Sequence, residues 1–147
     1  IPGAEEALQE LAEVATMIAV SNGTESVERG RLKLSGFEKY FDDIFISEAV
    51  GVSKPNPKIF QMAMRKLGIE HSDKVLVVGD SLSADIQGGV NAGLDTCWVN
   101  MKGLENESGL TPTYEVKALS ELYPIVMEED ELQNVGLKNR KHQNDAI

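Results

Sequence analysis

The sequence predicts an α/β fold built on a doubly wound parallel sheet. Short apolar runs alternate along the chain with stretches whose apolar residues recur every three to four positions. The runs have the length and β-branched composition of buried parallel strands, and short loops join them to the helical stretches. Strands that alternate with helices through short connections form a parallel sheet with helices on both faces.

Composition limits the class of protein and its partners. The 147 residues suffice for one domain, and 41% hydrophobic residues indicate a globular chain. The formal net charge of −10 argues against non-specific binding to nucleic acid or acidic lipid. Cys97 is the single cysteine, which excludes an intrachain disulfide and fits a reducing cytoplasm. Because the sequence shows no signal peptide and no apolar run of membrane-spanning length, we expect a cytoplasmic location.

The first predicted helix covers residues 4–12 and leads into a short strand over residues 17–20. The helix has apolar residues at helical spacing with acidic residues between them, and a Pro-Gly pair precedes it. The strand is followed by Ser21-Asn22-Gly23-Thr24. Small polar residues after a buried strand form a loop whose N–H groups can bind an anion, or an ordinary turn that caps the next helix.

A second helix and strand follow. Residues 25–34 are predicted to be helical and to end at Gly36, because glycine adopts the left-handed backbone common after a last helical turn. Residues 44–46 form the next apolar run, and we expect residues 47–53 to be a loop.

Lys54 lies between this loop and a predicted helix. Pro55 restricts Lys54 to an extended backbone. Asn56 can cap the helix, and Pro57 suits its first position. Apolar residues then recur at helical spacing until Gly68. The lysine would therefore have a fixed place just before a helix; the alternative is an ordinary solvated surface lysine.

The most informative stretch runs from Lys74 to Asp85. Four apolar residues followed by Gly79 and Asp80 are typical of a buried parallel strand. In open α/β sheets, chemistry collects at the carboxyl ends of such strands. Asp85 follows about one turn later, and two carboxylates so spaced suit Mg²⁺. The alternative is that both acids cap the entrance of the next helix.

The remaining elements continue the alternation. Ser83 can cap a helix whose Gly88 and Gly89 allow close approach to the sheet, and Cys97 is expected to be a buried apolar side chain. We predict further strands over residues 96–99 and 114–116 and a last helix over residues 118–126. Residues 1–126 are assigned to the core, and residues 127–147, acidic and then basic, to a polar tail.

Three loops are predicted to meet at one edge of the sheet. Ser21 and Asn22 supply neutral donors, and Lys54 supplies a cation. Asp80 and Asp85 supply carboxylates for a metal. A phosphate dianion needs donors and positive charge, and Mg²⁺ bridging to its oxygens assists its transfer. The order of these loops therefore predicts a site for a small phosphorylated metabolite and Mg²⁺.

In this order the loops resemble the motifs of the haloacid dehalogenase-like (HAD) hydrolases. Ser21 after an apolar strand resembles the second motif, Lys54 in GVSKPNPKIF the third, and GDSLSAD the fourth. The similarity covers residues 1–123 and is particularly close to the nucleoside 5′-monophosphatase branch in RLKLSGFEKYFDDIFISEAVGVSKPNPKIF and DIQGGVNAGLDTCWVN. Acylneuraminate 9-phosphate phosphatases share much of the last segment.

The first motif of that family, an apolar strand followed by Asp-x-Asp-x-Thr, is missing from the sequence. In the family this strand lies between those that correspond here to the strands ending at Ser21 and Asp80, so its absence would leave a gap. The cap domain of this branch is missing too. We expect a longer protein, with a portion before Ile1 that carries the nucleophile, the central strand and the cap.

The resemblance implies a Mg²⁺-dependent phosphomonoester hydrolase. An aspartate outside this chain would attack phosphorus and form an aspartyl-phosphate, which water hydrolyses, so this chain alone is expected to be inactive. The implied catalytic residues are Lys54, Asp80 and Asp85, the implied phosphate-binding residues are Ser21, Asn22, Gly23 and Lys54, and the implied metal ligands are Asp80 and Asp85.

Other functions fit parts of the pattern. The expected substrate is a nucleoside 5′-monophosphate, and the runner-up is a sugar phosphate such as an acylneuraminate 9-phosphate. A HAD-like binding module that has lost its nucleophile is the non-enzymatic alternative. A phospho-acceptor receiver domain also uses acids and a lysine on a doubly wound sheet, but its acidic pair precedes its lysine, whereas here Lys54 comes first.

Overall fold

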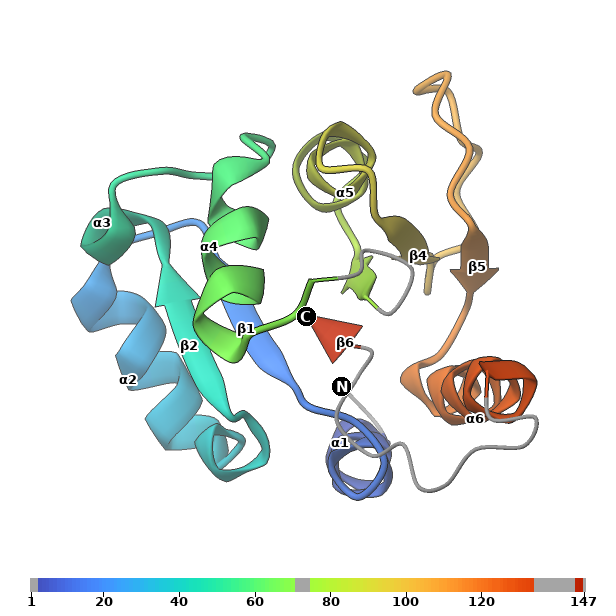
Figure 1. Cartoon of the computed structure of the whole chain (residues 1–147), viewed down its shortest axis with the longest axis horizontal. Coiled ribbons are helices and arrows are strands. Elements are labelled where there is room, and N and C mark those ends of the chain that lie inside the picture. Colours follow the sequence, from blue (N-terminus) through green and yellow to red (C-terminus); the bar gives the residue numbers. More distant parts are fainter. Residues whose placement is uncertain (1–2, 71–74, 134–144, 147) are drawn as a thin grey trace.

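The predicted parallel α/β architecture is confirmed by a computed structural model, which describes residues 3–70, 75–133 and 145–146 (Figure 1). In one sheet, β1 (Ile18–Ser21) pairs with β2 (Asp43–Ile46). In the other, the order is β5 (Tyr114–Val116), β4 (Asp95–Val99), β3 (Leu76–Gly79) and β6 (Asp145–Ala146). Every one of these pairs is parallel.

The helices lie between the strands in sequence and cover both faces of the sheets (Figure 1). The α-helices are α1 (Ala4–Ala12), α2 (Glu25–Ser35), α3 (Ser47–Val50), α4 (Lys58–Leu67), α5 (Gln87–Asn91) and α6 (Leu122–Gln133). Single turns of other helical types are η1 (Glu38–Tyr40), η3 (Leu82–Ile86) and η4 (Leu119–Glu121). Within residues 3–70, 75–133 and 145–146, every helix is too short or too polar to cross a bilayer.

Two hydrophobic clusters form the core, one on each face of β3. Leu76 and Val78 pack with Leu11 of α1 and Leu122 of α6. Val77, which points the opposite way, packs in a cluster that includes Ile59, Phe60 and Ala63 of α4. Because successive side chains of a strand point to opposite faces, a continuous apolar run is what a strand buried on both sides requires.

The sheet is interrupted between β1 and β3. β6 lies in this position in Figure 1 and pairs with only the first half of β3, Leu76 with Asp145 and Val77 with Ala146. These two residues belong to the stretch assigned to the polar tail, and the structure places them in a short strand. Residues 134–144 and 147, which we had assigned to the polar tail, lie outside the described residues.

Several element boundaries differ from the predictions. Residues 47–50, predicted as loop, form the one-turn helix α3 and end at Gly51 with φ of 84°. The expected cap Ser83 is replaced by Ser81, whose Oγ accepts the Ala84 N–H at 3.1 Å. The last helix continues to residue 133 instead of ending at 126. The hydroxyls of Ser81 and Ser83 can both cap a helix and lie two positions apart, so the sequence leaves the choice between them open.

Gly89 brings α5 directly onto the sheet. A Cβ built on Gly89 would lie 2.5 Å from Thr96 Cγ2 and 3.2 Å from Val77 Cβ, so the predicted close approach to the sheet is confirmed for Gly89. A Cβ on Gly88 would meet Phe60 and Pro55 instead. We expect Gly89→Ala to lower the free energy of unfolding by about 1–3 kcal/mol through overpacking. Gly30 in α2 has no heavy atom within 4 Å of such a Cβ, so Gly30→Ala should raise stability by roughly 0.5–1 kcal/mol. Urea unfolding of both variants checks the contrast, and equal effects would contradict it.

Candidate functional site

The carboxyl ends of β1 and β3 meet at Lys54. The Lys54 ammonium donates to the Val20 carbonyl at 2.8 Å, at the end of β1. It also donates to Asp85 Oδ1 at 2.5 Å, in the turn that follows β3. The Lys54 and Asp85 side chains are only 12% and 11% exposed. The alternative of a solvated surface lysine is therefore wrong, and the predicted meeting of these loops at one sheet edge is confirmed.

Asn22 fixes the main chain of Lys54 to the loop after β1. Asn22 Oδ1 accepts the Lys54 N–H at 2.8 Å, and Asn22 Nδ2 donates to the Lys54 carbonyl at 2.9 Å. This two-bond arrangement across 32 positions of sequence sets where the lysine enters the site. The Lys54–Pro55 peptide bond is cis, and the Pro55 carbonyl accepts Asn91 Nδ2 at 3.0 Å. The side chain of Asn22 thus holds the lysine loop in place.

Asp85 is a buried acid with both oxygens engaged. Oδ1 accepts Lys54 Nζ, and Oδ2 accepts the Ser81 N–H at 3.1 Å. A Cβ on Gly79 would lie 2.1 Å from Asp85 Oδ2, so only glycine lets the carboxylate approach the strand this closely. Asp85 sits in η3, a π-helical turn in which the Ile86 N–H bonds the Ser81 carbonyl; such turns are common at functional sites.

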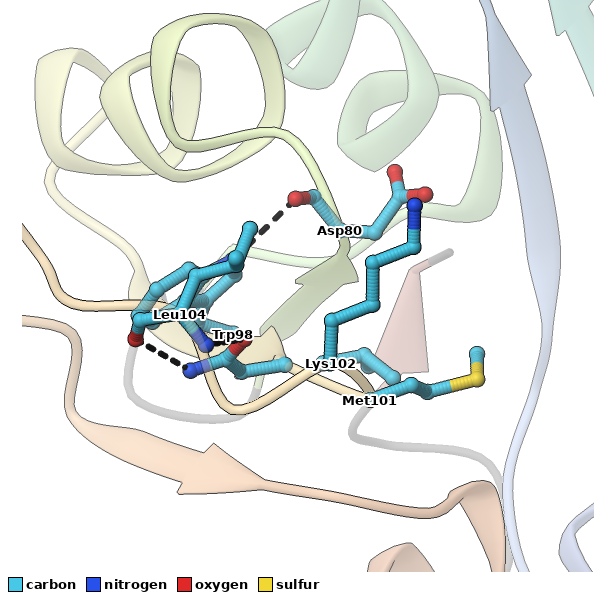
Figure 2. A pocket seen from close by; sticks show the side chains of 7 residues that line it. Asp80, Trp98, Met101, Lys102 and Leu104 are labelled. Atoms are coloured by element: carbon cyan, nitrogen blue, oxygen red, sulfur yellow. Dashed lines mark hydrogen bonds between the residues drawn. The ribbon is translucent and has the colours of Figure 1, made fainter.

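Asp80, by contrast, is exposed and lines a cavity. Its main-chain carbonyl accepts Trp98 Nε1 at 3.1 Å. Among the described residues, no protein group donates to its side chain. Asp80 lines a cavity of about 240 Å³ with residues that include Trp98, Asn100, Lys102 and Leu104 (Figure 2). The Lys102 side chain extends from the β4 end toward the same side of this cavity as Asp80 in that view.

A second cavity, of about 480 Å³, shares Asp80, Trp98 and Leu104 with the first. Its other walls are Leu82, Ser83, Gln87, Glu105, Ser108 and Leu110. Asn100, only 3% exposed, fixes the loop between the cavities by bonding both the N–H and the carbonyl of Leu104 at 2.9 Å. Apolar walls with a few polar groups are typical of binding cavities for small organic molecules.

The predicted phosphate loop already has protein partners. Ser21 Oγ donates to Glu28 Oε2 at 2.8 Å. The Gly23 N–H donates to Ser47 Oγ at 2.9 Å, and the Gly23 carbonyl accepts the same hydroxyl at 3.2 Å. Ser47 thereby joins the start of α3 to the loop after β1. Sequence reasoning missed Ser47 and Glu28, because each is an ordinary helix-entry residue by composition.

The side chains at this site fit a divalent cation that takes most of its ligands from water and substrate oxygens. In residues 3–70, 75–133 and 145–146, no three His, Cys, Asp or Glu side chains cluster to hold a metal. Asp80 offers a free carboxylate, whereas Asp85 uses both oxygens within the protein. Mg²⁺ commonly binds through one or two carboxylates together with waters and substrate phosphates.

Known proteins with similar sequences include nucleotidases, phosphatases and a haloacid dehalogenase. The chain is 43% identical over 126 residues to pyrimidine 5′-nucleotidase YjjG of Escherichia coli (strain K12), covering 86% of this chain and 56% of that protein. It is 34% identical over 125 residues to human N-acylneuraminate-9-phosphatase, covering 84% of this chain and 50% of that enzyme. The chain spans about half the length of the curated relatives it matches.

Solved structures and a family model agree with these relatives. HAD-hydrolase YfnB of Bacillus subtilis, in a crystal structure bound to magnesium, has a TM-score of 0.81 and 39% identity, covering 86% of this chain and 55% of that one. A HAD phosphatase from Thermococcus onnurineus has a TM-score of 0.78 and 32% identity, covering 86% of this chain and 57% of that one. The family model for haloacid dehalogenase-like hydrolases matches residues 1–93. This chain therefore belongs to the haloacid dehalogenase-like hydrolases.

Proposed function

We propose that this chain supplies the phosphate-binding and metal-binding half of a Mg²⁺-dependent phosphomonoesterase. The observation that carries the proposal is the buried Lys54 ammonium, held at the edge where β1 and β3 end. A fixed cation beside neutral donors and a free carboxylate is what a phosphoryl group with a divalent cation requires.

Each residue has a role that follows from its contacts. Lys54 lies between Val20 and Asp85, so its charge is oriented toward the bound phosphoryl group at little cost in side-chain entropy. Asp85 orients Lys54 and Ser81, and Asn22 positions the lysine loop. Ser21 and the Asn22 N–H would hold phosphate oxygens, whereas the Gly23 N–H already donates to Ser47 Oγ. Asp80 would hold Mg²⁺, which supplies charge stabilisation for the transferring phosphoryl group when bound.

The nucleophile is proposed to come from outside this chain. In described residues 3–70, 75–133 and 145–146, Asp80 and Asp85 are the aspartates at the carboxyl ends of β1 and β3, and both have other roles above. In the complete protein, a further parallel strand would lie between β1 and β3 in the place that β6 takes here beside the first half of β3, and its carboxyl end would lie beside Lys54 and Asp80. An aspartate there would form and release the aspartyl-phosphate expected from the sequence.

The cavities beside Asp80 are proposed to take the organic part of the substrate. Their combined walls include Trp98, Leu104 and Leu110, which suit a flat aromatic group such as a nucleobase, whose ring faces stack on apolar side chains. The identity to pyrimidine 5′-nucleotidases supports nucleoside 5′-monophosphates as the substrate class. The identity to N-acylneuraminate-9-phosphatases makes sugar phosphates the second candidate.

Substrate profiling of the natural polypeptide that contains residues 1–147 tests this proposal. With Mg²⁺ present, we expect release of inorganic phosphate from pyrimidine nucleoside 5′-monophosphates with kcat/KM at least about tenfold above that for acylneuraminate 9-phosphate. Chelation by EDTA should remove activity, and added Mg²⁺ should restore it. Full turnover in EDTA would contradict the metal assignment, and a preference for the acylneuraminate ester would favour the second candidate.

A further inference from the structure

Glu28 lies beside the phosphate-binding loop in a position that opposes phosphate binding. We propose that Glu28 is a positioning residue that draws the Ser21 hydroxyl away from the phosphoryl group and thereby sets the affinity of the site for phosphate. The inference rests on the proposed function, because it takes Ser21 as a ligand of the phosphoryl group. It adds a residue outside the family motifs found in the sequence.

The hydrogen bond between the two side chains has a defined direction. Ser21 Oγ lies 2.8 Å from Glu28 Oε2. An ionised carboxylate only accepts hydrogen bonds, and a hydroxyl has a single proton to donate. The Ser21 proton is therefore committed to Glu28. The hydroxyl then presents only lone pairs on its remaining side, and these repel the oxygens of a phosphate dianion.

The charge of Glu28 also lies close to the loop. A Cβ on Gly23 would be 2.8 Å from Glu28 Oε1, so the carboxylate packs against the main chain of Gly23. The Glu28 side chain is only 18% exposed. Its ion-pair partner within the described part of the chain is Arg31, at 3.6 Å and with 74% of its side chain exposed. Such an exposed cation compensates a neighbouring charge weakly.

Phosphate binding through Ser21 thus has two costs. The hydroxyl must rotate, which leaves Glu28 without its donor, and the incoming dianion must approach a carboxylate one hydrogen bond away. Both costs apply to substrate and to inorganic phosphate alike. Glu28 should therefore weaken binding of the ground state and of the transition state equally. A change of this kind alters KM and leaves kcat unchanged, so Glu28 should act on KM.

Glu28→Gln tests the inference with little change in shape. The glutamine amide can donate to Ser21 Oγ, which frees the serine proton for phosphate and removes the charge. In the natural polypeptide that contains residues 1–147, we expect KM for a nucleoside 5′-monophosphate to fall about tenfold. The inhibition constant of inorganic phosphate should fall by the same factor, and kcat should change by less than about twofold. Glu28→Ala, which also frees the proton, should shift both constants in the same direction.

A double-mutant cycle separates positioning from general electrostatics. In a Ser21→Ala background, where no hydroxyl remains to be released, Glu28→Gln should lose most of its effect. Glu25→Gln is the matched control, because Glu25 begins the same helix, pairs with Arg29 at 3.2 Å and has 47% of its side chain exposed. It makes the same charge change without touching Ser21, so it should leave both constants unchanged within about twofold.

The outcomes distinguish this inference from the proposed function. If Ser21→Ala weakens phosphate inhibition while both Glu28 variants behave as wild type, the inference is wrong and the phosphate site stands. If neither Ser21→Ala nor the Glu28 variants change the inhibition constant of phosphate, Ser21 does not bind phosphate and both are overturned. Equal effects of Glu28→Gln with and without Ser21 would also overturn the positioning role, since they would leave only charge.

Discussion

Lys54→Met is expected to abolish turnover of the natural polypeptide that contains this chain, by at least about a thousandfold in kcat. The lysine is the fixed cation of the site, and methionine fills its volume without the charge. The substitution should also lower the free energy of unfolding by about 3–5 kcal/mol, because Asp85 would remain buried and unpaired. Steady-state kinetics and urea unfolding measure the two effects separately.

A compensating variant distinguishes catalysis from folding. Lys54→Met combined with Asp85→Asn removes both charges, and the new side chain still accepts the Ser81 N–H. This double variant should recover much of the lost stability and none of the activity. Lys54→Arg retains the charge and should retain more activity than Lys54→Met. Recovery of turnover in the double variant would show that Lys54 acts only through stability.

Lys66 provides a matched control for removing a lysine from an ion pair. Lys66 Nζ lies 2.5 Å from Asp43 Oδ2 with 63% of the lysine side chain exposed. Burial raises the pKa of Asp43, but the hydrogen bonds from Lys66 and the Ile44 N–H outweigh it and hold the pKa below its usual value. Asp43 is the first residue of β2, so it lies at the opposite end of the strand from the carboxyl ends that form the site. Lys66→Met should therefore leave kcat unchanged.

Asp80→Asn is expected to remove most Mg²⁺-dependent turnover while leaving the fold intact. Its carboxylate is exposed and supports no hydrogen bond among the described residues, and Trp98 bonds to its main chain instead. The free energy of unfolding should therefore change by less than about 0.5 kcal/mol. Activity should fall by a factor of roughly a hundred or more, with a raised Mg²⁺ requirement. A Mg²⁺ titration of the reaction rate measures both.

The control for this substitution is Glu38→Gln, which removes one exposed negative charge in η1. It should leave the Mg²⁺ requirement and the rate unchanged. Wild-type activity of Asp80→Asn at saturating Mg²⁺ would contradict the metal assignment. An equal loss in both variants would indicate a non-specific effect of net charge, because the chain carries −10 at pH 7.

Sequence reasoning succeeded where the physical cause is local. The run Val75–Val78 is apolar at every position, and only a strand covered on both faces requires that pattern. Gly36 and Gly68 end α2 and α4 with φ of 75° and 71°, as glycine's lack of a Cβ allows. The order of Ser21, Lys54 and Asp80 along alternating strands and helices likewise predicted which sheet edge they would share.

Side-chain hydrogen bonds decided the rest of the site, some between residues 31 or 32 positions apart and others between residues four or seven positions apart. The sequence by itself determined β1 to β5, most helices and the residue types at one edge of the sheet, because these depend on periodicity and on residues a few positions apart. Only the tertiary structure decided that Asn22 holds the main chain of Lys54, that Asp85 gives both oxygens to protein donors, and that Ser21 donates to Glu28. The physical reason is that hydrogen-bond partners are chosen by distance in space, and alternating elements bring together residues whose spacing in sequence carries no such signal.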